Sequence, residues 1–260
     1  MSAIVVLEWK FSPPDYFESQ IEIEQDDYIM TIEDGKVDAR IDSAIYEANP
    51  LMRDALHKVL NSRFLGVLLY SHKPYRLENP TMARLHDDGR KDYFLMVEPM
   101  EIKLTGGEVE FQITNKDGNV VVDTKRDRIE KKKAIADLAS KHASEDFVLA
   151  LLRSYEDSVR DPNNELIYLY EIRDALYHRF GKDKKGMRDK LGISSDEIKN
   201  LGKLCNDEPL RQGRHRGKKY AYDSLRDATE AELSEARETA KAMIEGYLRY
   251  LDTASNSINP

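Results

Sequence analysis

The sequence predicts an α+β protein, with an N-terminal, mainly antiparallel β domain that contains one helix and a C-terminal all-α helical bundle. Three observations lead to this prediction. Residues 1–126 consist largely of short β-branched or alternating runs separated by turn residues, which is typical of antiparallel strands. Residues 127–254 carry apolar side chains at helical spacing, and residues 255–260 are expected to form a disordered tail. The chain has 260 residues, of which 40% are hydrophobic, so its size and composition suit two modest domains.

The clearest strand signal lies around Asp34-Gly35. Tyr28–Ile32 precedes this pair and Lys36–Ile41 follows it. A tight hairpin turn needs positive φ angles, and Asp-Gly adopts them at little energetic cost. We therefore expect a β-hairpin here. Other β-rich runs predict further strands at Ala3–Trp9, Tyr93–Val97, Met100–Leu104, Val109–Thr114 and Asn119–Asp123.

Between residues 50 and 90 the pattern changes twice. Apolar residues fall at helical spacing from Pro50 to Arg63, which predicts the one helix of this domain. The continuous apolar run Phe64–Tyr70 then predicts a buried central strand. From Ser71 through Arg90 the sequence is mostly polar, which predicts a long surface loop.

This predicted loop contains a candidate second site. The candidate residues of this site are His72, Arg84 and His86, which supply two imidazoles and one guanidinium. The simpler alternative is that these residues face water, as loop residues usually do. Two aspartates follow His86, but no partner with metal-ligand spacing accompanies them, so we expect no metal site.

In the C-terminal region, capping residues mark the helix boundaries. Ser194–Glu197 and Thr229–Glu232 both match the capping box, in which a hydroxyl and a glutamate satisfy two unpaired amides at the start of a helix. The long run Leu166–Phe180 is apolar on two faces, which predicts the central helix of a bundle, and Gly181 ends it. The final helix is expected to bury a stripe from Leu233 to Leu251.

Charge and composition limit the classes of function. The net charge is −8, and residues 1–42 contribute all of it because they hold 11 acidic and 3 basic side chains (3 − 11 = −8). We expect a solvated acidic surface there and any nucleic-acid contact elsewhere. No apolar run approaches the roughly 20 residues of a membrane span, and no secretory signal is apparent. The single cysteine, Cys205, fits a reducing, cytoplasmic location. P-loop and nucleophile-elbow motifs are absent from the sequence.

The most distinctive stretch is the basic loop at residues 206–219, Asn-Asp-Glu-Pro-Leu-Arg-Gln-Gly-Arg-His-Arg-Gly-Lys-Lys. Five cations and a histidine lie within its last nine residues, and Pro209, Gly213 and Gly217 interrupt regular structure. A basic, flexible loop between helices suits an anion, and we expect that anion to be phosphate. The alternative is a solvated loop, or one paired with acids of the final helix. Arg173 and His178 on the central helix would assist an anion site if their face turns inward, and otherwise they are surface residues.

Helix order and one short motif resemble the HEPN superfamily over about residues 128–252. The order is a helix, a long Tyr/Leu-rich helix, a short helix, Asn-Asp-Glu-Pro-Leu-Arg, Arg-His-Arg-Gly and a final helix. Members are compact helical bundles, many of them dimeric, and active members cleave RNA without metal through an arginine and a histidine that meet across the dimer. The resemblance implies a homodimer in which Arg211 and His215 are catalytic. Only three residues separate these two, fewer than in active members, so an inactive, RNA-binding member is the alternative.

The chemistry of the basic loop agrees with phosphate as its ligand. Histidine titrates near neutrality, so His215 could take or give the protons that RNA cleavage moves. Arginine binds two phosphate oxygens at once. The expected phosphate-binding side chains are Arg214, Arg216, Lys218 and Lys219.

The predicted function is therefore binding of RNA or of a nucleotide phosphate without a cofactor. Metal-independent ribonuclease activity in a defence or stress response is its catalytic form. The β domain is then expected to act as a sensor or partner-binding module. The alternative is a non-catalytic, dimeric protein-interaction or regulatory module whose basic loop binds an acidic protein surface.

Overall fold

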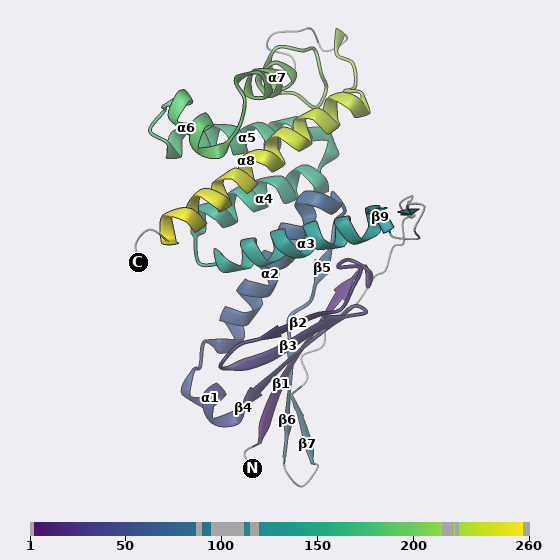
Figure 1. The fold of residues 1–260 in the computed structure, drawn as a ribbon, viewed down its shortest axis with the longest axis vertical. Helices are drawn as coiled ribbons and strands as arrows, with labels where there is room; N and C mark the ends of the chain where they lie inside the picture. Colours follow the sequence, from purple (N-terminus) through teal and green to yellow (C-terminus); the bar gives the residue numbers. More distant parts are fainter. Residues whose placement is uncertain are drawn as a thin grey trace. The chain divides into compact units, whose positions relative to one another are not determined.

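The fold is known from a computed structural model (Figure 1), which describes residues 3–86, 90–94, 112–114, 120–214, 221 and 224–256. The chain forms two compact units. The β unit comprises Met1–Val67 and Tyr75–Ala136, and the helical unit comprises Leu68–Pro74 and Asp137–Pro260. The predicted α+β arrangement, with an N-terminal antiparallel sheet and a C-terminal helical region, is confirmed. The predicted domain boundary at residue 126 stays a prediction.

Within its described residues, the β unit is built on an antiparallel sheet of seven strands in which β2-β3-β4-β1-β6-β7 are neighbours in this order, while β5 pairs with β1. Strand β1 is central and pairs with β4 on one side and β6 on the other. A separate hairpin joins β8 and β9. The strands are β1 (Ile4–Ser12), β2 (Ile21–Glu24), β3 (Tyr28–Glu33), β4 (Lys36–Asp42), β5 (Arg76–Leu77), β6 (Thr81–Leu85), β7 (Lys91–Phe94), β8 (Gln112–Thr114) and β9 (Val120–Asp123).

The predicted Asp34-Gly35 hairpin is confirmed. It joins β3 to β4, and both turn residues have positive φ, 45° at Asp34 and 78° at Gly35. Glycine is required at the second position because a Cβ there would lie only 3.2 Å from the carbonyl oxygen of Phe11. The turn therefore sets the register that pairs Glu33 with Lys36.

Helix α2 (Met52–Ser71) corrects the prediction of a central strand at Phe64–Tyr70, which was wrong. The helix predicted from residue 50 continues through this run. Phe64 packs its ring against Phe11 of β1 and Phe17, with centroids 5.1 and 4.8 Å away. Because the run is buried on nearly all sides, it has no polar face, and the helical period is lost in the sequence.

The loop predicted from residue 71 through 90 is also corrected, because it contains β5 and β6. Strand β6 pairs with β1 from Ile4–Leu85 to Glu8–Thr81. Its five residues are all half-buried, so they lack the alternation that marks a strand. Helix α1 (Ser43–Ala48) was not predicted either. The predicted strand Met100–Leu104, and the parts of two others at 95–97 and 109–111, lie outside the described residues.

In the helical unit, α5 packs against α4, α6, α7 and α8 (Figure 1), and α8 packs against α4, α5, α6 and α7, so the predicted central helix shares its position with α8. Helix α3 begins in the β unit and ends in the helical unit. Within the described residues, no helix has the length and apolar character needed to cross a membrane. The helices are α3 (Thr124–Lys141), α4 (Asp146–Arg160), a short 3-10 helix (Pro162–Asn164), α5 (Glu165–Arg179), α6 (Lys184–Leu191), α7 (Ser195–Asn206) and α8 (Glu230–Asn256).

Both predicted capping boxes are confirmed. At α7, the amide of Ser194 donates to Glu197 Oε2 at 2.8 Å, and the amide of Glu197 donates to Ser194 Oγ at 3.2 Å. At α8, the amides of Thr229 and Glu232 make the same reciprocal bonds at 2.8 and 3.3 Å. Helix α8 extends to Asn256, into the predicted tail, and residues 257–260 lie outside the described part of the chain.

A buried ion pair fixes the N-terminus of α5 against α8. The side chain of Glu165 is only 2% exposed, and Arg237 donates to its two oxygens from Nε at 2.5 Å and from Nη2 at 3.0 Å. His72 Nε2 lies 3.6 Å from Glu165 Oε1. A buried carboxylate is stable only when it is paired, so this contact sets where α5 begins relative to α8.

Candidate functional site

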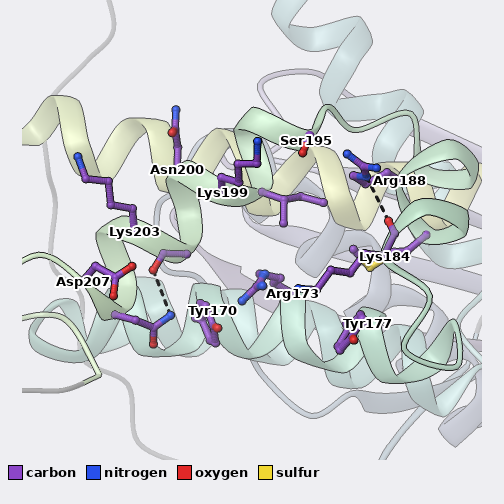
Figure 2. A pocket seen from close by; sticks show the side chains of 14 residues that line it. Tyr170, Arg173, Tyr177, Lys184, Arg188, Ser195, Lys199, Asn200, Lys203 and Asp207 are labelled. Carbon is purple, nitrogen blue, oxygen red and sulfur yellow. Dashed lines mark hydrogen bonds between the residues drawn. The ribbon is translucent and has the colours of Figure 1, made fainter.

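The candidate site is a basic pocket of about 700 Å³ between α5, α6 and α7. Figure 2 shows Arg173 in its middle, between Tyr170 and Tyr177 of α5, with Lys184 and Arg188 of α6 toward one end. Helix α7 runs along the opposite side of the pocket, with Ser195 near Arg188 and with Lys203 and Asp207 toward the other end (Figure 2). The residues that line it are Tyr170, Arg173, Tyr177, Lys184, Met187, Arg188, Ser195, Ile198, Lys199, Asn200, Gly202, Lys203, Asn206 and Asp207.

Local sequence explains how α6 forms one wall of the pocket. Asp183 caps α6 by accepting from the amide of Lys185, and Gly192, with φ of 69°, ends the helix. In α6, Lys184 and Arg188 are four residues apart, so they share one face. The Arg188 guanidinium donates through Nε to the carbonyl of Lys184 at 3.2 Å, which holds it at the pocket wall (Figure 2).

The position of α6 is set by a close approach to α8. Gly246 lies on α8, and a Cβ there would be 2.4 Å from the carbonyl oxygen of Leu191, the last residue of α6. Met187 and Leu191 are buried on this side of α6. Met187 also lines the pocket beside Lys184 and Arg188, because residues three and four positions apart lie on one face of the helix.

The pocket lining is strongly positive. Among the described residues, it has one acidic side chain, Asp207, and five basic ones, namely Arg173, Lys184, Arg188, Lys199 and Lys203. Lys199 lies 3.3 Å from Asp196 and Lys203 lies 3.2 Å from Glu208, so these two cations have carboxylates nearby. Lys184 and Arg188 have no ion-pair partner within the described part of the chain. An anionic ligand would supply that partner.

A second group of charges lies beside the pocket. Tyr170 carries two guanidinium groups over its ring, that of Arg173 at 4.7 Å from the centroid and that of Arg214 at 4.5 Å. Asp174 contacts both arginines, with Oδ1 3.6 Å from Arg173 Nη1 and Oδ2 3.2 Å from Arg214 Nη1. One carboxylate thus bridges two guanidinium groups, which is how a phosphate also binds arginine pairs.

A backbone hydrogen bond ties the basic loop at Arg214 to the last turn of α7. The amide of Arg214 donates to the carbonyl of Cys205 at 2.8 Å. Gly213 passes close to the same backbone, and a Cβ there would lie 3.1 Å from the Cys205 oxygen. Burial raises the pKa of the Cys205 thiol to about 12, although the nearby Arg173 and Arg214 favour the thiolate. The buried thiol is therefore protonated at physiological pH, which argues against a role as a nucleophile.

The predicted catalytic pair is described only in part. Arg211 is half-exposed, lies 3.7 Å from Asp227 through its Nε, and does not line the pocket. Its amide donates to the carbonyl of Arg226 at 2.9 Å. Arg214 is the one predicted phosphate-binding residue that the described structure places, and it lies beside the pocket rather than in its lining. The remaining predicted residues lie outside the described residues: His215, Arg216, Lys218 and Lys219.

The three residues of the candidate second site each contact a carboxylate of their own unit. In the β unit, Arg84 lies 2.8 Å from Glu47 and His86 lies 2.8 Å from Asp92. His72 belongs to the helical unit, where it lies beside the buried Glu165. In the described ranges, no group of three His, Cys, Asp or Glu residues is placed to hold a metal ion.

Sequence reasoning missed most of the pocket. The segment Arg179–Lys190 carries six basic and two acidic residues (6 − 2 = +4), a clear excess in a chain of net charge −8. This excess was the signal that could have identified α6 as a wall of a basic site. Of the two residues considered on the central helix, Arg173 turns into the pocket and His178 is exposed.

No protein-family model, curated protein or solved structure matches this chain.

Proposed function

We propose that the helical unit binds RNA or a nucleotide through its phosphate groups in the basic pocket between α5, α6 and α7. One observation carries this proposal: five basic side chains and two tyrosines line a cavity of about 700 Å³ in a protein of net charge −8. A concentration of cations against the sign of the whole chain is the electrostatic footprint of an anion-binding surface.

Arg173 is the main positive charge of the pocket. Its side chain is only 18% exposed, so its charge is partly removed from water and interacts more strongly with an anion than a fully solvated one would. The planar guanidinium can hold two phosphate oxygens at once. Lys184 and Arg188 add charge without a carboxylate partner in the described chain. A phosphate beside Arg173 could therefore also contact Lys184 and Arg188 of α6, and no described ion pair of these two residues would first have to break.

The tyrosines of the pocket extend the proposal from phosphate to nucleotides. Tyr170 and Tyr177 are seven residues apart on α5, so they lie on one face about 10 Å apart along the helix axis. Aromatic rings next to cations bind bases by stacking while the cations bind the backbone. Arg173 lies between the two rings (Figure 2), and Tyr170 already carries the guanidinium groups of Arg173 and Arg214, so a base would stack on Tyr177 while Arg173 binds a phosphate.

The basic loop completes the proposal in its HEPN-like form. Arg214 stands beside the pocket, and Arg216, Lys218 and Lys219 follow it in the sequence. In this form the protein is a homodimer, Arg211 binds the phosphate, and His215 moves the proton that metal-independent RNA cleavage requires. Binding does not depend on this catalytic step, so the two are tested separately.

Binding is tested with a fluorescein-labelled RNA octanucleotide and the double variant Lys184→Gln/Arg188→Gln. Removing two phosphate contacts should weaken binding on the order of tenfold or more and reduce the dependence of log K on log salt by about 2. The matched control, Lys131→Gln/Lys133→Gln, removes the same charge from exposed positions on α3 and should change little. Equal loss in both double variants, or no RNA binding by the wild type, would reject the proposal.

Cleavage is tested by incubating the protein with total RNA in the absence of metal, with His215→Ala as the comparison. A product that requires His215 supports the ribonuclease. Intact binding without any product rejects catalysis and leaves the binding proposal in place. A salt-sensitive dimer that binds no RNA supports the alternative, a non-catalytic interaction module.

A further inference from the structure

A second, smaller cavity lies at the C-terminal end of α5. Its volume is about 370 Å³, and α6 and α8 form its other walls. It belongs entirely to the helical unit. The residues that line it are Arg179, Phe180, Lys190, Tyr247 and Tyr250.

The aromatic rings of this cavity form a cluster with one buried and two half-buried members. Tyr247 is buried and forms the floor, with Phe180 and Tyr250 beside it at centroid distances of 6.2 and 6.1 Å. Phe180 and Tyr250 meet at 5.5 Å and 64°. Half-buried rings at a cavity keep part of their surface open to another flat ring.

Two cations accompany the rings. Lys190 Nζ lies 5.6 Å from the centroid of Phe180 and 5.2 Å from that of Tyr250. Arg179 donates through Nε to the hydroxyl of Tyr247 at 3.1 Å. Neither cation has an ion-pair partner among the described residues. The cavity thus combines exposed positive charge with aromatic surface.

This cavity and the basic pocket share two helices. Tyr177 of α5 lines the pocket, and Phe180, which follows the last residue of α5, lines the cavity three residues or about 4.5 Å further along the axis. On α6, Arg188 lines the pocket and Lys190 lines the cavity. The lining residues of the two cavities are only two or three positions apart on each helix, so a ligand of several nucleotides is long enough to reach both, whereas a single phosphate can contact only one.

We infer that the ring cavity is a base-stacking subsite, so that the ligand of the basic pocket is a single-stranded nucleic acid of several nucleotides. This inference rests on the proposed function. A strand offers alternating flat bases and phosphates, which match the rings of Phe180 and Tyr250 and the charges of Lys190 and Arg179. Stacking does not require the 2′-hydroxyl, so RNA and DNA strands share the chemistry that this subsite recognises.

The test measures binding of labelled RNA and DNA octanucleotides by fluorescence anisotropy, and binding of uridine monophosphate and inorganic phosphate by calorimetry. Tyr250→Leu removes the ring and should weaken octanucleotide binding by about 5- to 150-fold, the loss that one stacked base gives. Tyr250→Phe keeps the ring and should bind like the wild type. Phosphate and monophosphate affinity should stay unchanged in both variants.

Tyr168→Leu is the matched control, because Tyr168 lies on α5 twelve residues before Phe180 and lines neither cavity. It should leave all four affinities unchanged. The subsite would be overturned if the octanucleotides bind no more tightly than the monophosphate, or if Tyr250→Leu leaves their affinity unchanged. Either result would leave the proposed phosphate pocket in place. If none of the four probes binds, the proposed function itself fails. Binding of both strands, or of one, supports the subsite and identifies the strand.

Discussion

Replacing Asp174 by asparagine should strengthen binding of RNA to the basic pocket. The Asp174 carboxylate contacts Arg173 at 3.6 Å and Arg214 at 3.2 Å, so it occupies two guanidinium groups that a phosphate would use. Its side chain is 42% exposed, so both contacts are surface ion pairs, each worth about 0.2–1 kcal/mol. Their loss removes a competitor worth about 0.4–2 kcal/mol, which corresponds to about two- to thirtyfold tighter binding.

The assay is fluorescence anisotropy with a labelled RNA octanucleotide at low and moderate salt. Asp157→Asn is the control, because it makes the same charge change at an exposed position on α4, which does not line the pocket. The gain from Asp174→Asn should exceed that of the control at both salt concentrations. Unchanged or weaker binding would refute the reasoning, because it would mean that Asp174 orders the two arginines rather than competing with the ligand.

Three further predictions concern stability, each measured by urea denaturation. Gly246→Ala should destabilise the protein by about 1–3 kcal/mol, because the new Cβ would lie 2.4 Å from the Leu191 oxygen. The cost of this overlap exceeds the gain of about 1 kcal/mol in helix propensity. A variant more stable than the wild type would contradict this prediction. Arg237→Met should cost about 3–5 kcal/mol because it leaves Glu165 buried and unpaired, and Glu165→Gln should cost less. Burial lowers the pKa of His72 from 6.5 to about 4, so the unfolded chain binds its proton more readily. The free energy of unfolding should therefore fall as pH decreases from about 6.5 to about 4, and His72→Gln should fall less over this window.

Elements with strong local chemistry could be predicted from the sequence. Asp34-Gly35 adopts positive φ whatever surrounds it, so the hairpin and its register follow from two residues. Ser194 and Thr229 mark the starts of α7 and α8 because each capping box is complete within four residues. By contrast, Phe64–Tyr70 has no local feature that separates a buried helix from a buried strand, and its identity depends on the packing against Phe11 and Phe17.

The candidate site was predictable only in part. The density of cations in residues 206–219 pointed to an anion site in the helical region, and Arg214 does lie beside the basic pocket. The pocket itself is formed by side chains from α5, α6 and α7, and its main cation, Arg173, looked like a surface residue of a long helix. Nothing in the spacing of Arg173, Lys184 and Arg188 shows that they face one cavity.

By itself, the sequence determined where the chain turns, where its helices are capped, and that an acidic protein carries a concentrated set of cations in its second half. These properties depend on residues that are neighbours along the chain. The tertiary structure alone decided which charged side chains meet, because Asp174 and Arg214 are 40 positions apart and come together only when α5 and α7 pack. Burial and long-range packing, rather than spacing, placed five positive charges around one cavity.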